Sequence, residues 1–128
     1  MTTNLKLSIL DGEYIVHRLL PESEIPAAAL SRNFLSITRT DDELSIVCDA
    51  QLSLNSDKSE SGWACIKVLG PLDFGLTGIL ARIASVFAQA EISIFAISTY
   101  DTDYLLVKKE KISATREVLL QAGYVFEN

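Results

Sequence analysis

The sequence predicts an α+β fold in which helices pack on antiparallel sheets. Two observations support this prediction. Residues 63–109 show in turn the patterns of a strand, a glycine-bearing loop, an amphipathic helix and two further strands. The residues before this stretch show a strand, a short helix and a hairpin in the same order. We therefore expect two related halves rather than one α/β sheet.

The first strand of the stretch, residues 63–69, stops at a glycine-rich loop. Gly70, Gly75 and Gly78 fall within nine residues, so the backbone can adopt positive φ and another group can approach it closely. An amphipathic helix follows, with Thr77 as its N-cap candidate. The unpaired amides of a helix start can bind a carboxylate or a phosphate. A plain strand-to-helix connection without a ligand is the alternative.

Two nucleotide-binding motifs are missing from this loop. The spacing of Gly70, Gly75 and Thr77 imitates a P-loop, but Leu76 stands where a lysine must reach the phosphates. The sequence has no G-x-G-x-x-G motif either, so a dinucleotide site has no support. We therefore exclude nucleoside triphosphates and expect no cofactor. No metal site is expected either, because the chain has no C-x-x-C motif and a single histidine.

Residues 92–100 and 104–108 are β-branched and aromatic runs joined by a polar turn, which is typical of a hairpin. The combined pattern, GPLDFGLTGILARIASVFAQAEISI followed by AISTYDTDYLLVKKE, resembles an ACT domain, a small regulatory unit that binds amino acids. The resemblance covers residues 63–109. It is greatest to the tandem ACT proteins related to the regulatory part of aspartate kinases and to arginine sensors of the CASTOR type.

The resemblance implies a ligand site beside the loop and at an interface with another ACT unit. The implied residues are Gly75, Leu76, Thr77 and Gly78 in the loop and Thr99, Tyr100 and Asp103 in the hairpin. Asp101 joins them because an acidic group in the hairpin can pair with an amine or a guanidinium. As solvated turn formers, Asp101 and Asp103 need no ligand, and this alternative stays open.

A shift of 61 residues places one hairpin of the chain on the other. Thr38, Asp42, Leu44 and Ile46 then fall on Thr99, Asp103, Leu105 and Val107, and Phe34 falls on Phe95. We interpret this match as a tandem repeat, with a degenerate ACT-like unit over residues 1–60 and an ACT domain over residues 61–128. The first unit lacks the glycine loop and is expected to be a structural partner.

The remaining elements follow from capping and turn signals. A second helix over residues 113–122, capped by Ser113 and ended by Gly123, precedes a last strand, so the second half reads βαββαβ, the ferredoxin-like arrangement. In the first half, Asp11-Gly12 predicts a hairpin between two extended runs. Residues 21–30 predict a short helix with Ser23 as its cap and Pro26 in its first turn, and the polar residues 53–62 predict a linker or a mobile loop.

Composition restricts the partners and the location. With a net charge of −6 and a pI of about 4.7, the chain favours neither nucleic acid nor an anionic membrane. The sequence has no membrane-spanning run and no signal-peptide pattern, so we expect a cytoplasmic protein. Cys48 and Cys65 are expected to be buried free thiols. His17 is expected to be structural, because the sequence identifies no acid and no nucleophile to work with it.

The predicted function is that of a non-catalytic regulatory module that binds a free amino acid. One glycine loop per chain, together with family sites that lie between units, predicts a homodimer. The alternative is a protein-interaction module of the same fold that works through strand edges or a helix face. An enzyme of this fold is a third hypothesis, but the sequence does not identify a base and a nucleophile that would meet at one site.

Overall fold

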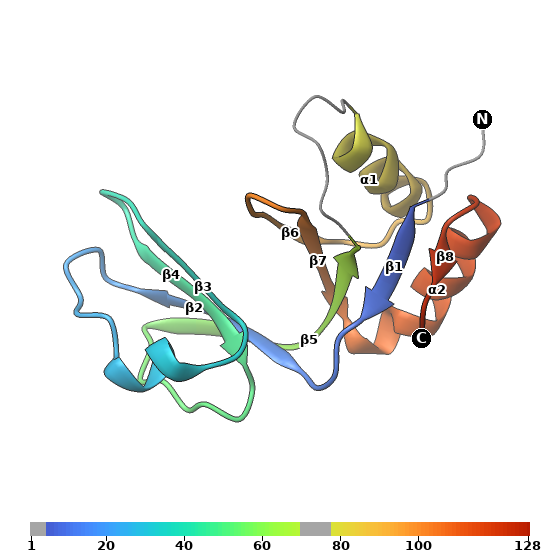
Figure 1. Ribbon diagram of the computed structural model, residues 1–128. Coiled ribbons are helices and arrows are strands. Elements are labelled where there is room, and N and C mark those ends of the chain that lie inside the picture. Colours follow the sequence, from blue (N-terminus) through green and yellow to red (C-terminus); the bar gives the residue numbers. More distant parts are fainter. Residues whose placement is uncertain (1–4, 70–77) are drawn as a thin grey trace. The chain divides into compact units, whose positions relative to one another are not determined.

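Figure 1 shows the protein as a computed structural model, which describes residues 5–69 and 78–128. Within these residues the strands are β1 (Lys6–Ile9), β2 (Tyr14–Leu19), β3 (Leu35–Arg39), β4 (Leu44–Asp49), β5 (Lys58–Val68), β6 (Phe95–Ser98), β7 (Asp103–Lys108) and β8 (Val125–Phe126). The α-helices are α1 (Ile79–Gln89) and α2 (Ile112–Gln121), and the 3-10 helices are η1 (Ala27–Ser31) and η2 (Lys109–Lys111). None of these helices has the length and apolar character needed to span a membrane.

The chain divides into two compact units. Unit 1 combines the segment up to Asp11 with Ala64–Asn128, and unit 2 spans Gly12–Trp63. Strand β1 belongs to unit 1 because it pairs antiparallel with β5 and parallel with β8. The two units are thus not the same residue sets as the predicted domains 1–60 and 61–128, which place this strand in the first half. Pairing between the two ends of a chain leaves no local pattern in its sequence.

Unit 1 has the predicted ferredoxin-like architecture. Its strands lie in the order β6-β7-β5-β1-β8, and β5, α1, β6, β7, α2 and β8 follow one another as βαββαβ. Both helices contribute to the core of this unit. Its buried side chains include Ile83 and Phe87 from α1, Leu119 from α2, and Ile66 and Leu105 from the sheet. The α+β fold class is therefore confirmed, with β1 as an additional strand between β5 and β8.

Unit 2 has a reduced version of the same strand order. Its strands lie in the order β3-β4-β2-β5, which matches β6-β7-β5-β1 of unit 1 position by position. Between β2 and β3, however, it has only the five-residue 3-10 helix η1 where unit 1 has α1. Its core includes Leu19, Leu44, Ile46 and Cys48.

Strand β5 contributes residues to both units. Residues 58–60 pair with β2 in unit 2, and residues 66–68 pair with β1 in unit 1. Between these segments the pairing with β2 shifts register, and Gly62 adopts a φ of +79°, as expected for a β-bulge. The predicted linker over residues 53–62 is therefore wrong from Lys58 onward. The first residues of β5 are polar and exposed, so the sequence shows no alternating apolar pattern there.

The two hairpins share one turn geometry. Arg39 pairs with Leu44 across a four-residue loop, and Ser98 pairs with Asp103 across another. Thr40 opens the first loop and Thr99 the second, and 99 − 40 gives an offset of 59. The predicted offset of 61 is therefore two residues too long for the turns. At 59, the buried Ile46, Val47 and Cys48 fall on the buried Leu105, Leu106 and Val107.

Two further predictions are wrong in the first half. Asp11-Gly12 does not close a hairpin, because β1 pairs with β5 and β8 while β2 pairs with β4 and β5. Gly12 does have the positive φ of a turn, +86°, but a turn signal does not specify which strands pair. The predicted helix over residues 21–30 is reduced to η1, which Pro26 precedes without a side-chain cap. Ser23 instead donates its backbone N–H to Leu20.

Both α-helices end in a Schellman motif. After α2, the N–H of Tyr124 donates to Leu119 O and the N–H of Gly123 to Leu120 O, each at 3.1 Å. Gly123 has a φ of +99°, as predicted for a C′ residue, whereas the N-cap is Lys111 rather than Ser113. After α1, the same position is taken by Glu91, whose φ is +58°. A non-glycine residue in this conformation is strained.

Candidate functional site

The candidate site lies at the end of unit 1 where β5 leads toward α1 (Figure 1). Three of the predicted site residues, Gly75, Leu76 and Thr77, lie outside the described residues, as does the N-cap predicted at Thr77. Gly78 is described and is the N-cap of α1, with a left-handed φ of +77°. Its carbonyl accepts the N–H of Arg82 at 2.9 Å, which is the first hydrogen bond of the helix.

The loop between β6 and β7 contains three of the predicted residues. Thr99 closes this loop: its N–H donates to Thr102 O at 2.8 Å, and its hydroxyl accepts the N–H of Thr102 at 3.2 Å. The same hydroxyl lies 3.0 Å from Thr102 O. Tyr100 and Asp101 occupy the tip, where the Tyr100 side chain is 80% exposed. The tip therefore presents an aromatic ring and a carboxylate to solvent on a closed turn.

Asp103 lies in a different environment from Asp101. It is the first residue of β7, it is partly buried, and its Oδ1 accepts the hydroxyl of Ser98 at 2.5 Å. Side chains of antiparallel pairs alternate between the two faces of a sheet, so the Ser98–Asp103 pair shares the face of the Ala96–Leu105 pair. Leu105 belongs to the core that contains the helices. The structure thus places Asp103 on the helix side of the sheet and Asp101 at the exposed tip.

Thr102 is a residue of this region that the sequence analysis did not single out. Its side chain is 4% exposed, and its hydroxyl donates to the backbone carbonyl of Val68, the last residue of β5. This bond joins the tip of the hairpin to the strand end just before the glycine-rich segment. A threonine between two aspartates in a turn gives no sign in the sequence of a contact with a residue so far away along the chain.

The corresponding end of unit 2 is occupied by the protein itself. At the offset of 59, Arg39 takes the position of Ser98 and Leu44 that of Asp103. The Arg39 guanidinium donates to the carbonyls of Pro21 and Ser23, in the segment that follows β2, and Leu44 is fully buried. Unit 2 therefore has a buried leucine at the position of the Asp103 carboxylate, and the neighbouring Arg39 guanidinium is already hydrogen-bonded within the protein.

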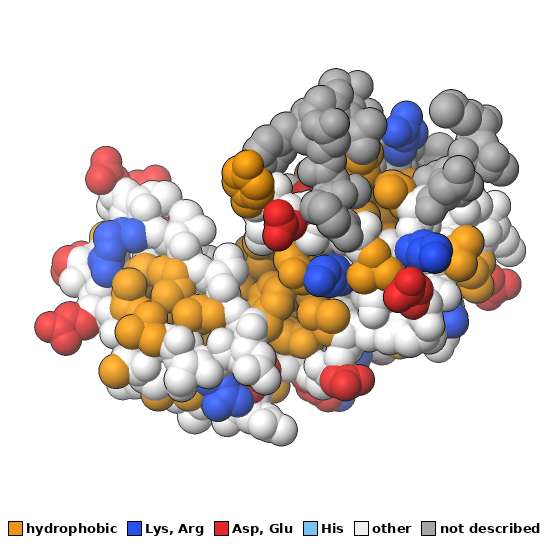
Figure 2. All heavy atoms as spheres, viewed as in Figure 1, with side chains coloured by type: hydrophobic (Ala, Val, Ile, Leu, Met, Phe, Trp, Pro, Cys, Tyr) orange, Lys and Arg blue, Asp and Glu red, His pale blue; other side chains and the backbone are white. Residues whose placement is uncertain are grey.

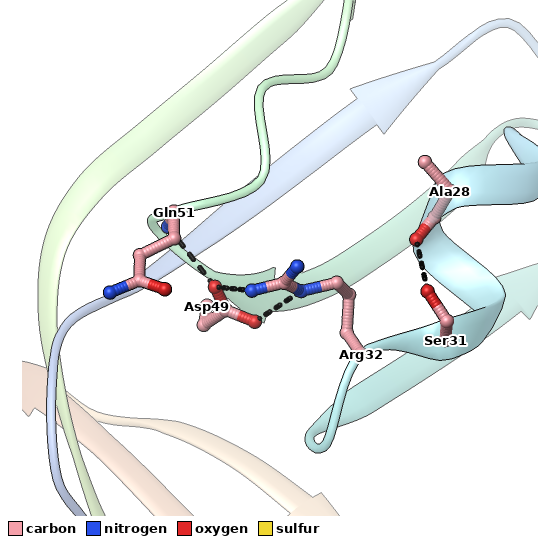
Figure 3. Close-up of polar contacts among 5 residues, drawn as sticks. All are labelled: Ala28, Ser31, Arg32, Asp49 and Gln51. Atoms are coloured by element: carbon pink, nitrogen blue, oxygen red, sulfur yellow. Dashed lines mark hydrogen bonds and ion pairs between the residues drawn. The ribbon is translucent and has the colours of Figure 1, made fainter.

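Another polar cluster of unit 2 holds the end of η1 to the end of β4 (Figure 3). Arg32 donates from Nε and from a terminal nitrogen to the two carboxylate oxygens of Asp49, both at 2.8 Å, and Gln51 N–H donates to the same carboxylate. This bidentate pair joins the end of η1 to the end of β4. The hydrogen bonds from Arg32 lower the pKa of Asp49, and those to Asp49 raise the pKa of Arg32.

His17 is a hydrogen-bonded strand residue and the two cysteines are buried, as expected. The His17 Nδ1 lies 3.0 Å from the Ser56 hydroxyl, and desolvation lowers the pKa of the imidazole. Its other ring nitrogen has no hydrogen-bond partner among the described residues. Cys48 and Cys65 are buried free thiols, and desolvation raises the pKa of Cys65 to about 12. The described residues also contain no cluster of three metal-ligating side chains.

Two family models match this chain, one in each half of the sequence. An ACT-domain model matches residues 58–121, and a second model, which describes an N-terminal domain, matches residues 12–52. Among curated relatives, the cytosolic arginine sensor for mTORC1 subunit 1 of Pongo abelii is 32% identical over 122 residues, which cover 88% of this chain and 37% of that protein. The chain thus spans little more than a third of that relative's length.

Solved structures show the same fold. A structural-genomics protein from Agrobacterium tumefaciens is 40% identical, with a TM-score of 0.89 over 98% of this chain and 93% of that one. The regulatory subunit of aspartate kinase from Thermus thermophilus has a TM-score of 0.65 over 95% of this chain and 99% of that one, at 12% identity. At that identity the likeness concerns the fold alone.

Proposed function

The chain belongs to the ACT-domain family, and we propose that it is a non-catalytic regulatory module that binds a free amino acid at the end of β5 in unit 1. A matched relative is described as an arginine sensor, and a matched structure is a regulatory subunit of an aspartate kinase. These descriptions apply to those proteins. They support the proposal because the candidate site of this chain has the chemistry that such a ligand requires.

The observation that carries the proposal is the placement of Asp103. Its carboxylate lies on the helix side of the sheet, in the hairpin whose tip is hydrogen-bonded to the strand that precedes the glycine-rich segment. Gly78 starts α1 without a side-chain cap, so amides of the first turn have no partner from the N-cap side chain. A carboxylate on one side and helix amides on the other complement an amino acid, which carries an amine and a carboxylate.

We further propose that the module works as a cytoplasmic homodimer. The face of the unit 1 sheet opposite Leu105 carries the fully buried Leu106 together with Phe95, Ile97 and Tyr104, which are partly exposed. Figure 2 shows hydrophobic side chains at the surface over the strands of this unit. Tyr100 adds an exposed ring at the hairpin tip. Partly exposed apolar side chains of this kind suit a contact with a second copy. Sedimentation equilibrium tests this point, and a 14 kDa species at high concentration would contradict it.

The function is tested by titration of the wild-type chain with free amino acids. Calorimetry with arginine, lysine, aspartate, leucine and glycine separates cationic, acidic, apolar and minimal ligands. The expected result is saturable binding of at least one of them, accompanied by a rise in Tm, because a ligand that binds only the folded state stabilises it. If none binds and none raises Tm, the amino-acid proposal fails. A protein-interaction module of the same fold then becomes the better explanation.

A further inference from the structure

The Thr102 side chain differs from its neighbours in the hairpin loop. Tyr100 and Asp101 are exposed, whereas Thr102 is 4% exposed and its hydroxyl donates to Val68 O. A buried hydroxyl without a partner is costly, so this hydroxyl is held to the carbonyl it faces. The loop is therefore docked at one point on the end of β5.

The loop itself has little freedom to move independently of Thr102. The backbone N–H and the carbonyl of Thr102 are both hydrogen-bonded to Thr99. Asp103 is the next residue and pairs with Ser98 across the hairpin. A shift of Thr102 relative to Val68 must therefore carry the turn and the Asp103 carboxylate with it.

We infer that Thr102 is a positioning residue for the proposed amino-acid site. This inference rests on the proposed function. The Thr102 hydroxyl does not act on the ligand; it sets where the Asp103 carboxylate stands relative to the end of β5. The proposed site holds the cationic group of the amino acid at this carboxylate, so the affinity depends on a hydroxyl that the ligand does not touch.

A purely structural role for Thr102 predicts a different result. In that case the loss of the hydroxyl lowers the overall stability and leaves the hairpin position and the affinity of the folded protein unchanged. The positioning role instead requires a local change in the hairpin together with weaker binding. Local opening of the hairpin can be measured without any ligand, through the exchange of the Thr99 and Thr102 amides, which are hydrogen-bonded in the loop.

The experiment compares three variants of the full chain. Thr102→Val removes the hydroxyl at constant shape, and Thr102→Ser keeps it. Thr115→Val is the matched control, because Thr115 is fully buried in unit 1 and its hydroxyl has no partner in the described structure. Each variant is checked by circular dichroism, examined by amide hydrogen exchange with NMR detection, and titrated with arginine, lysine, aspartate, leucine and glycine alongside the wild type.

Thr102→Val should accelerate exchange of the Thr99 and Thr102 amides about five- to tenfold and weaken binding by a similar factor. Thr102→Ser keeps the hydroxyl, so its exchange rates and its affinity should remain close to those of the wild type. Thr115→Val should change neither quantity. Faster exchange with unchanged affinity would overturn the positioning role and leave the proposed function standing. Unchanged exchange in Thr102→Val would overturn the docking of the loop. A wild type that binds no amino acid would overturn the proposed function and with it the positioning role, while the exchange data would still decide whether Thr102 docks the loop.

Discussion

The hydroxyl of Ser98 donates to Oδ1 of Asp103, its cross-strand partner, at 2.5 Å. This bond fixes one carboxylate oxygen and so limits the rotation of the side chain. Asp101, two residues away, is exposed at the tip of the loop. The two acidic residues of the hairpin are therefore expected to differ in their effect on a ligand.

Asp103→Asn should weaken the binding of a cationic amino acid about ten- to a hundredfold, because the substitution keeps the size of the side chain and removes its charge. Asp101→Asn is the matched control and should leave the affinity within about twofold, since an exposed charge is screened by solvent. Calorimetric titration of both variants measures the difference. Equal affinities in the two variants and the wild type would show that the cation is bound elsewhere.

Each chain should bind one amino acid. In unit 2 the Arg39 guanidinium already binds the carbonyls of Pro21 and Ser23, and the buried Leu44 stands at the position of Asp103. Calorimetric stoichiometry should therefore be close to one ligand per chain. Two ligands per chain would mean that unit 2 offers a site of its own in spite of Arg39.

Substitution of Gly78 should act through backbone conformation. No atom of residues 5–69 and 78–128 lies within 4 Å of the position that a Cβ would take there, so the expected effect does not come from a collision with these residues. The φ of +77° is strained for alanine and better tolerated by asparagine. Gly78→Ala should lower the free energy of unfolding by roughly 1 kcal/mol, and Gly78→Asn by less. Urea denaturation of the two variants measures this order, and the reverse order would contradict it.

Glu91→Gly should stabilise the protein. Glu91 ends α1 at a φ of +58°, the position that Gly123 takes after α2 at +99°. Glycine adopts this conformation without the penalty of a Cβ, so the gain should be roughly 1 kcal/mol in the free energy of unfolding. Gly123→Ala is the complementary variant and should lose about as much. A loss of stability in Glu91→Gly would show that the glutamate side chain contributes more than its backbone costs.

The Arg32–Asp49 pair should make the stability of the fold depend on pH in the acidic range. Because the hydrogen bonds from Arg32 lower the pKa of Asp49 below its ordinary 3.8, the folded state binds this proton less readily than the unfolded state. The stabilisation is therefore fully present above pH 3.8, the ordinary pKa of an aspartate, and is lost as the pH falls through the lower pKa of Asp49 in the folded state. Asp49→Asn should lower Tm at neutral pH, and the difference from the wild type should shrink at about pH 3. Asp57→Asn, which loses one bond to Arg18 at 3.1 Å, is the control with a smaller effect. A pH-independent difference would contradict this assignment.

Features encoded in contiguous residues could be predicted from the sequence. The helical stripe of α1, the glycine that ends α2 and the hairpin of β6 and β7 each depend on a few neighbouring positions, and all three are present. The first part of β5 was not predicted as a strand, because its exposed residues are polar and show no apolar alternation. The short η1 was overestimated because capping signals do not report helix length.

Contacts between distant residues could not be predicted in this way. The pairing of β1 with β5 and β8, the bond from Thr102 to Val68 and the bonds from Arg39 to the segment after β2 join positions with no common local pattern. Within the candidate site, the sequence and the family resemblance named Asp103 and Gly78. Only the structure separates Asp103 from Asp101 and adds Thr102.

Each unit of the chain contains one buried free thiol, Cys48 in unit 2 and Cys65 in unit 1. Burial raises the pKa of both, and an alkylating reagent attacks the thiolate, so neither cysteine reacts until its surroundings open. The rate of alkylation at each cysteine, resolved by peptide mass spectrometry, therefore reports the opening of the structure around that cysteine. The native sequence thus carries two chemical probes that can show which unit an amino acid protects, without any engineered label.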